Sequence, residues 1–165
     1  MINNHLADFA AREFPERPIL LAENEEEDIE LIRRTLEKFR LINSFHVVRT
    51  GEDALAYLKG EGRFSDRDKY PLPELLLLDL ELPGIDAFSV LRALRQQAHL
   101  PPIRVVVLAS TNQTRELSLA FQSGANSFMF KPVRTERFID TILSMNGCWL
   151  WVNTTHDLRL SAPIQ

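Results

Sequence analysis

The chain has 165 residues, a formal net charge of −4 and one cysteine. This length fits one domain with short extensions, and such a domain buries enough surface to fold without a disulfide or a structural metal. The acidic balance argues against a nucleic-acid binder that uses a basic face. Every apolar run is far shorter than the ~20 residues that span a bilayer, so we expect no membrane contact. The single Cys148 favours a reducing, cytoplasmic location.

Short apolar runs alternate with segments of helical periodicity along the whole chain. The predicted strands are Ile19–Ala22, Phe45–Val48, Leu75–Leu78, Ile103–Ala109 and Ser127–Phe130. The apolar positions that predict the helices between and after them are Ile29, Ile32, Leu36 and Phe39, then Leu55 and Leu58, then Phe88, Leu91 and Leu94, then Leu117, Ala120 and Phe121, and finally Phe138, Ile142 and Met145. Strict alternation predicts an α/β fold, a (βα)₅ chain with a parallel sheet and helices on both faces.

Turn-forming residues mark where several elements begin and end. The segment Thr50–Asp53 is expected to open the helix that contains Leu55 and Leu58. The polar run Ser110–Asn112 is expected to cap the helix that follows it, and Gly124 to end that helix. The segment Gly60–Pro73 is rich in Gly, Pro and charge, which predicts a long surface loop.

An apolar segment, Cys148–Val152, lies near the C-terminal end of the chain and contains Trp149 and Trp151. Two interpretations remain open. The segment folds back onto the core of its own chain, or it forms a hydrophobic patch for a partner or a second copy.

The residues at the carboxyl ends of the strands are candidates for a site, because ligands bind there in open parallel sheets. They are Glu23 and Asn24 after the first strand, Asp79 and Glu81 after the third, Ala109, Ser110 and Thr111 after the fourth, and Lys131 after the fifth. Paired carboxylates favour a cation with oxygen ligands such as Mg²⁺, and a lysine and hydroxyl groups suit a phosphoryl group. Asp79 is therefore a candidate nucleophile toward a phosphoryl donor.

Each of these residues also has an ordinary structural interpretation. An Asp after a strand is often a turn or cap residue, and a lone Lys131 would usually be a solvated surface lysine. The acids Glu25–Asp28 are expected to serve as the acidic start of a helix, where the helix dipole favours negative charge. The joint occurrence of the candidates at four strand ends favours the functional interpretation.

These residues resemble the receiver domain of two-component response regulators. The resemblance covers Pro18–Met145 and rests on three stretches, which are Ile19–Asn24, Leu75–Gly84 and Gly124–Pro132. It implies a flavodoxin-like, doubly wound (βα)₅ sandwich, with a receiver domain at residues 18–146, an N-terminal extension at 1–17 and a C-terminal extension at 147–165.

The resemblance also implies roles for individual residues. Asp79 would accept a phosphoryl group from a partner histidine kinase, and Lys131 would pair with the phosphate. Glu23, Asp79 and the backbone carbonyl of Glu81 would hold Mg²⁺. The peptide bond before Pro132 is typically cis in this family, and Phe128 falls on its aromatic switch position.

More narrowly, Gly60–Pro73 and the tryptophan-containing tail resemble single-domain regulators that pair with phytochrome-type kinases and often form homodimers. No DNA-binding output domain is expected after Met145, because only about twenty residues follow it.

Two departures from the family pattern affect the expected chemistry. The second of the two usual acids after the first strand is Asn24, which retains an oxygen ligand but removes one negative charge. The usual Thr or Ser of the fourth strand is Ala109, although Ser110 and Thr111 lie beside it. A lost hydrogen bond to a charged group costs about 1.5–3 kcal/mol, which is similar to a typical allosteric coupling energy. Ala87 in place of a common glycine is a minor change.

The sequence leaves three functions open. The first is a switch that is phosphorylated on Asp79, is not an enzyme, and changes its affinity for a partner or a second copy. The second is a pseudo-receiver that binds proteins without phosphorylation, for which Asn24 and Ala109 are the reasons. The third is a phosphatase with an aspartyl nucleophile, suggested by Asp79-Leu80-Glu81.

Overall fold

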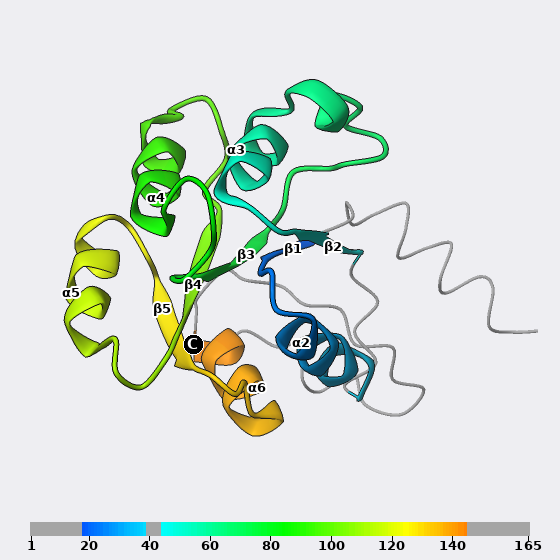
Figure 1. Cartoon of the computed structure of the whole chain (residues 1–165). Coiled ribbons are helices and arrows are strands. Elements are labelled where there is room, and N and C mark those ends of the chain that lie inside the picture. The colour runs from blue at the N-terminus through cyan, green and yellow to red at the C-terminus, as the bar shows by residue number, and fades with distance from the viewer. Residues whose placement is uncertain (1–17, 39–43, 145–165) are drawn as a thin grey trace, which may run out of the picture.

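A five-stranded parallel sheet forms the centre of the protein (Figure 1). The computed structural model describes residues 18–38 and 44–144. The strands are β1 (Ile19–Ala22), β2 (Phe45–Val48), β3 (Leu75–Asp79), β4 (Arg104–Ala109) and β5 (Ser127–Phe130), in the order β2-β1-β3-β4-β5. The predicted flavodoxin-like topology is confirmed. Because the strand order reverses between β1 and β3, their carboxyl ends border the crevice where such folds bind ligands.

Helices cover both faces of this sheet, as Figure 1 shows. The helices are α2 (Glu26–Lys38), α3 (Gly51–Lys59), α4 (Ala87–Gln96), α5 (Thr114–Gln122) and α6 (Thr135–Ser144), with a short 3₁₀ helix η1 (Gly62–Phe64). The core divides accordingly into two apolar clusters. One joins α2 and α6 to the sheet, and the other joins α3, α4 and α5 to the opposite face.

The four consecutive leucines of β3 show why this sequence forms a central strand. All four are fully buried, and alternate members enter different clusters: Leu75 and Leu77 face α2 and α6, whereas Leu76 and Leu78 face the other three helices. A strand that is apolar on both faces is stable only between two layers of helices. This burial fixes the end of β3, and therefore the place of Asp79.

The predicted start was right for one helix, and the predicted cap was wrong for another. The segment Thr50–Asp53 opens α3, as predicted, and the Thr50 side chain caps the helix by accepting a hydrogen bond from the Asp53 N–H. The run Ser110–Asn112 does not cap α5, which begins at Thr114 with Gln113 at its cap position. Instead, the Gln113 side chain turns back and accepts a hydrogen bond from the Ser110 N–H, at 2.7 Å. This bond stabilises the β4–α5 loop.

The predicted loop at Gly60–Pro73 is folded onto the protein rather than extended from it. Phe64 of η1 is buried, and its ring packs against those of Tyr57 and Tyr70, with centroids 5.2 and 5.1 Å apart. The Arg67 guanidinium donates to the carbonyl oxygens of Tyr57 and Leu58, each at 2.8 Å. These carbonyls end α3, where the helix leaves its last acceptors without intrahelical donors.

The β3–α4 loop is attached to the start of α3. The Gly51 N–H donates to the Pro83 carbonyl at 3.0 Å, and the Ile85 N–H donates to the Glu52 carboxylate at 3.2 Å. A Cβ atom at Gly51 would overlap the Ile85 carbonyl oxygen, so the close approach requires glycine. The chain that leaves Asp79 is thereby held in place by a neighbouring helix.

Arg95 at the end of α4 joins several elements at the opposite end of the sheet. Its guanidinium donates to the carbonyl oxygens of Gly124, at 2.6 Å, and Ile103, at 3.1 Å. It also donates to the Asn126 side-chain oxygen, which accepts a second bond from the Val105 N–H. One side chain thus connects the end of α4 to the segments that begin β4 and precede β5.

Several predicted features lie outside the described residues. They include Phe39 and Met145 of two helical patterns, Cys148, both tryptophans and the two extensions. In the part of the chain that the structure describes, no helix has the length and apolar character needed to cross a membrane.

The contact of Gly51 with the β3–α4 loop predicts whether Gly51→Ala raises or lowers the free energy of unfolding. Helix propensity alone predicts that Gly51→Ala stabilises α3, by up to ~1 kcal/mol. The overlap with Ile85 predicts instead a loss of ~1–3 kcal/mol in the free energy of unfolding, because the β3–α4 loop must move. Urea denaturation of both proteins measures the difference. An unchanged or higher stability would show that the loop is not held by this contact.

Candidate functional site

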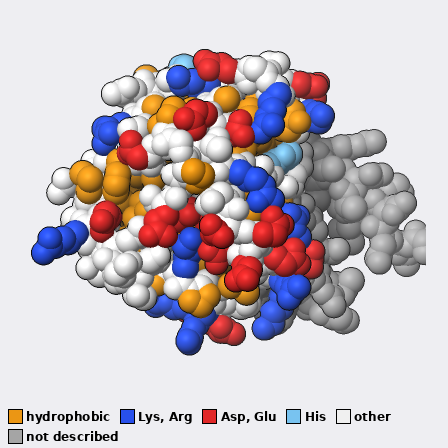
Figure 2. Space-filling view, in the orientation of Figure 1, with side chains coloured by type: hydrophobic (Ala, Val, Ile, Leu, Met, Phe, Trp, Pro, Cys, Tyr) orange, Lys and Arg blue, Asp and Glu red, His pale blue; other side chains and the backbone are white. Residues whose placement is uncertain are grey.

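The carboxyl ends of β1, β3 and β5 bring together Glu23, Asp79 and Lys131. The Lys131 ammonium lies 3.2 Å from Glu23 Oε2 and 3.4 Å from Asp79 Oδ1. Both carboxylates are buried, with 0% and 1% of their side chains exposed, and the lysine side chain is 12% exposed. The residues come from three strands, so the sheet topology alone accounts for their convergence. Figure 2 shows Asp and Glu side chains gathered across the middle of this face.

The turn after β1 fixes the Glu23 carboxylate. Its Oε1 atom accepts hydrogen bonds from the N–H groups of Asn24, at 2.9 Å, and Glu25, at 3.0 Å. Burial raises the pKa of the Glu23 carboxyl above its ordinary value, and the nearby charge of Asp79 raises it further, while the bond from Glu25 and the charge of Lys131 act in the opposite direction. The site therefore holds more negative charge than its lysine neutralises, a condition that a bound cation relieves.

Asp79 closes β3 and starts the anchored loop. Its Oδ1 atom accepts a hydrogen bond from the Glu81 N–H at 3.1 Å, which bends the chain around the carboxylate. The Leu80 N–H donates to the Leu108 carbonyl and keeps β4 alongside. The Glu81 side chain is exposed, and its carboxylate is 3.5 Å from the Ser110 hydroxyl.

Lys131 follows β5 and is held by contacts from both its backbone and its side chain. Its N–H donates to the Ala109 carbonyl at 2.9 Å, and the peptide bond to Pro132 is cis, which confirms the expectation from the resemblance. Burial alone would lower the pKa of the lysine. A hydrogen bond to Asp28 and the charges of Asp79 and Glu23 outweigh burial and raise that pKa well above its ordinary value.

Asp28 is a site residue that the sequence analysis missed. It was assigned only to the acidic start of a helix, but its Oδ2 atom lies 3.0 Å from the Lys131 ammonium, the shortest of the three ion pairs of that lysine. A signal was present in the sequence. Asp28 precedes the buried Ile32 and Leu36 by four and eight residues, a spacing that places it on the inward face of α2.

Asn24, the first departure from the family pattern, lies at the mouth of the site. Its side-chain amide donates to the Glu25 carboxylate at 3.4 Å, and its backbone carbonyl accepts a bond from Arg49 at 3.4 Å. The Arg49 guanidinium also pairs with Glu26 at 2.7 Å. These contacts leave the amide side chain half-buried beside Glu23.

Ala109, the second departure, occupies the last position of β4. The register pairs Leu108 with Asp79 and Ala109 with Phe130, so no shift of β4 places a hydroxyl at this buried position. Ser110 faces Glu81, and Thr111 is exposed. The Ala109 side chain is a buried methyl group, so the end of β4 offers no hydroxyl at this position.

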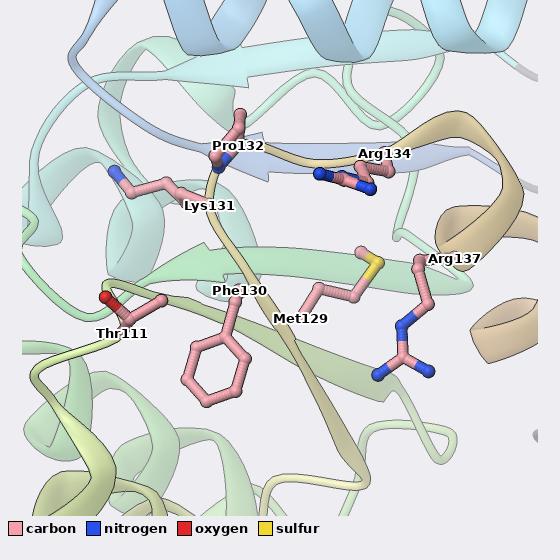
Figure 3. A pocket seen from close by; sticks show the side chains of 7 residues that line it. All are labelled: Thr111, Met129, Phe130, Lys131, Pro132, Arg134 and Arg137. Carbon is pink, nitrogen blue, oxygen red and sulfur yellow. The ribbon is translucent and has the colours of Figure 1, made fainter.

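A hollow of about 400 Å³ lies beside β5 and the residues that follow it. Figure 3 shows the guanidinium groups of Arg134 and Arg137 on one side of it and the Lys131 ammonium directed away from both. Its lining residues are Thr111, Met129, Phe130, Lys131, Pro132, Arg134 and Arg137. Phe128, on the same strand, is half-buried, and its ring centroid lies 5.3 Å from that of Phe130.

The donors at this site fit Mg²⁺ with water as the remaining ligands. In residues 18–38 and 44–144, no three or more His, Cys, Asp or Glu side chains form a group that could hold a metal ion. Mg²⁺ in proteins usually takes one or two carboxylates and keeps several waters. The two buried carboxylates of Glu23 and Asp79 match that requirement, and the ammonium of Lys131 beside them shows that the position attracts positive charge.

A family profile described as "Response regulator receiver domain" matches residues 19–143, which is most of the chain. The chain belongs to the response regulator receiver family.

Relatives of this receiver chain include regulators associated with phytochromes. Probable methanogenesis regulatory protein FilR2 of Methanothrix harundinacea (strain 6Ac) is 33% identical over 138 residues, which cover 82% of this chain and 84% of that protein. The structure of the bacteriophytochrome response regulator RtBRR matches with 35% identity and a TM-score of 0.74, over 84% of this chain and 83% of that one. Response regulator Rcp1 of Synechocystis sp. (strain ATCC 27184 / PCC 6803 / Kazusa) is 27% identical over 82% of this chain and 90% of its own length. Its Mn²⁺-bound form matches with a TM-score of 0.65, 27% identity and coverage of 76% of this chain and 88% of that one.

The raised pKa of Glu23 predicts a pH dependence of stability. Because the folded protein holds this proton more tightly than the unfolded chain, the contribution is fully present below the unfolded pKa of about 4.5 and is lost as pH rises through the folded value. In metal-free buffer, Glu23→Gln should therefore gain stability relative to the natural protein as pH rises from 4.5 to 7. Urea denaturation at several pH values measures this difference. A difference that falls with pH would contradict the prediction.

Proposed function

We propose that this receiver is a single-domain response regulator that accepts a phosphoryl group on Asp79 from a partner sensor histidine kinase in the cytoplasm. Glu23, Asp79 and the Glu81 carbonyl would hold Mg²⁺, with the Asn24 amide oxygen as a further donor. The observation that carries the proposal is the buried Asp79 carboxylate, which lies 3.4 Å from Lys131 at the carboxyl end of β3.

The transfer needs little from the protein beyond position and charge. An Asp79 carboxylate oxygen forms the new P–O bond, the P–N bond to the donor histidine breaks, and the imidazole leaves with the electron pair. Mg²⁺ would supply positive charge that offsets the charge of the phosphoryl oxygens. Lys131 contributes a second positive charge from the β5 side, and its ammonium also lies 3.2 Å from Glu23. No substrate is turned over, so the receiver acts as a switch and not as an enzyme.

The relay step would use protein–protein contacts on the α5–β5 surface. Phe121 and Leu119 of α5 are each 43% exposed, and the Phe121 ring packs edge-on against Phe128 at 6.1 Å. Exposed apolar side chains on a helix that begins beside the β4–α5 loop suit a partner or a second copy of the chain. The names of RtBRR and similar structures support a kinase of the phytochrome type. The proposed homodimer contact of the tail concerns residues outside the described ranges.

Asn24 and Ala109, the two departures from the family pattern, favour a second function. Asn24 directs its amide group to Glu25, and Ala109 presents no hydroxyl to Asp79. A pseudo-receiver with these features would bind its partner without phosphorylation.

Phosphorylation of Asp79 separates these two functions. Incubation with acetyl phosphate and Mg²⁺ should add the mass of one phosphoryl group to the intact protein, because the buried Asp79 carboxylate lies beside Lys131 and the proposed Mg²⁺ ligands. Asp79→Asn should acquire no such mass under the same conditions. Intact-protein mass spectrometry measures both. No adduct on the natural chain at high donor concentration would favour the pseudo-receiver.

Ala109 gives a separate prediction about the switch. Ala109→Ser would return a hydroxyl to the end of β4, where a bond to a phosphoryl oxygen is worth about 1.5–3 kcal/mol. Phosphorylation should then change hydrogen exchange at residues 110–113 more strongly, by roughly tenfold or more, than it does in the natural protein. Ala120→Ser, which adds a buried hydroxyl on α5, serves as the control. Equal changes in the natural protein and Ala109→Ser would show that the loop responds by another route.

A further inference from the structure

The Lys131 ammonium is shared among three carboxylates, of which one has no role in the function proposed above. Asp28 Oδ2 is 3.0 Å from Nζ, against 3.2 Å for Glu23 and 3.4 Å for Asp79. An ammonium group has three hydrogen atoms to donate, so it can pair with all three carboxylates, which then share one positive charge. The lysine is thus drawn most strongly away from Asp79, toward α2.

Lys131 and a bound metal ion would compete for the same Asp79 carboxylate. The Asp79 carboxylate would bind the metal ion and later the phosphoryl group, whereas a close ion pair with Lys131 would occupy it. Asp79 is almost fully buried, and at such a site charges are poorly screened by water. Any group that holds the ammonium back from Asp79 therefore leaves this carboxylate better able to bind a cation.

The charges at the site support the same conclusion. Asn24 lacks the negative charge that the family usually places after β1, and Asp28 supplies a carboxylate from the first turn of α2 instead. Three carboxylates and one ammonium leave a formal charge of −2, which matches one divalent cation. Asp28 is 23% exposed, so it reaches this position from the rim of the site and not from its floor.

We propose that Asp28 is a positioning residue that holds Lys131 off Asp79 and so maintains the affinity of the site for Mg²⁺. This inference rests on the proposed function, because it assumes that the cation binds at Glu23 and Asp79. Asp28 acts through the lysine and does not contact the cation.

The test measures Mg²⁺ binding to the full chain directly, by titration calorimetry without a phosphoryl donor. Asp28→Asn should weaken Mg²⁺ binding by roughly tenfold or more, the usual effect of removing a group that orients metal ligands. Asp28→Glu, which keeps the charge and can reach Nζ, should restore most of the affinity. Glu27→Gln removes one charge from an exposed neighbour on the same helix and should leave the affinity nearly unchanged.

A double-mutant cycle tests whether Asp28 acts through Lys131. In a Lys131→Met background no ammonium competes for Asp79, so Asp28→Asn should change Mg²⁺ affinity little. The cycle also cancels any loss of stability that is common to both backgrounds, and urea denaturation confirms that each variant is folded. Equal losses in both backgrounds, or no loss in either, would overturn the inference. Absence of Mg²⁺ binding by the natural chain would instead overturn the proposed metal site, and this inference with it.

Discussion

One ammonium group connects the segments that form the site. Lys131 after β5 contacts Glu23 after β1, Asp79 at the end of β3 and Asp28 in α2, so four stretches of chain meet at a single nitrogen atom. Buried carboxylates repel each other, and without a shared cation their convergence would be unfavourable. The lysine therefore stabilises the cluster of carboxylates in the folded protein, but its single positive charge does not neutralise all of them.

The rest of the structure keeps these groups in place from a distance. The leucines of β3 are buried on both faces, which fixes Asp79 along the strand direction. Gly51 and Glu52 hold the loop that follows, and the Gln113 side chain holds the loop after β4. The site is thus formed on rigid strands, and its borders are short loops that neighbouring helices restrain.

Much of this arrangement was predictable from the sequence. Short apolar runs between helical patterns predicted all five strands within one residue. For β1, β3 and β4 the reason is that nearly complete burial leaves such runs few alternatives. The convergence of Glu23, Asp79 and Lys131 followed from topology alone, since parallel strands end at one edge. The contact of Asp28 with Lys131 was not predicted, because a helix-start acid has a sufficient local explanation. The cap of α5 was missed for a related reason: Ser110–Asn112 have the right residue types, but the Gln113 side chain decides the turn.

The contacts of Arg95 affect how a structural change near Asp79 would move α5. Its guanidinium fastens the carbonyl of Gly124, just beyond the end of α5, to α4 and to the segment that leads into β4. The other end of α5 begins beside the β4–α5 loop, next to the site. A helix that is held at one end and displaced at the other rotates about the held end. Small displacements near Asp79 would therefore rotate the N-terminal end of α5, while its C-terminal end acts as the hinge.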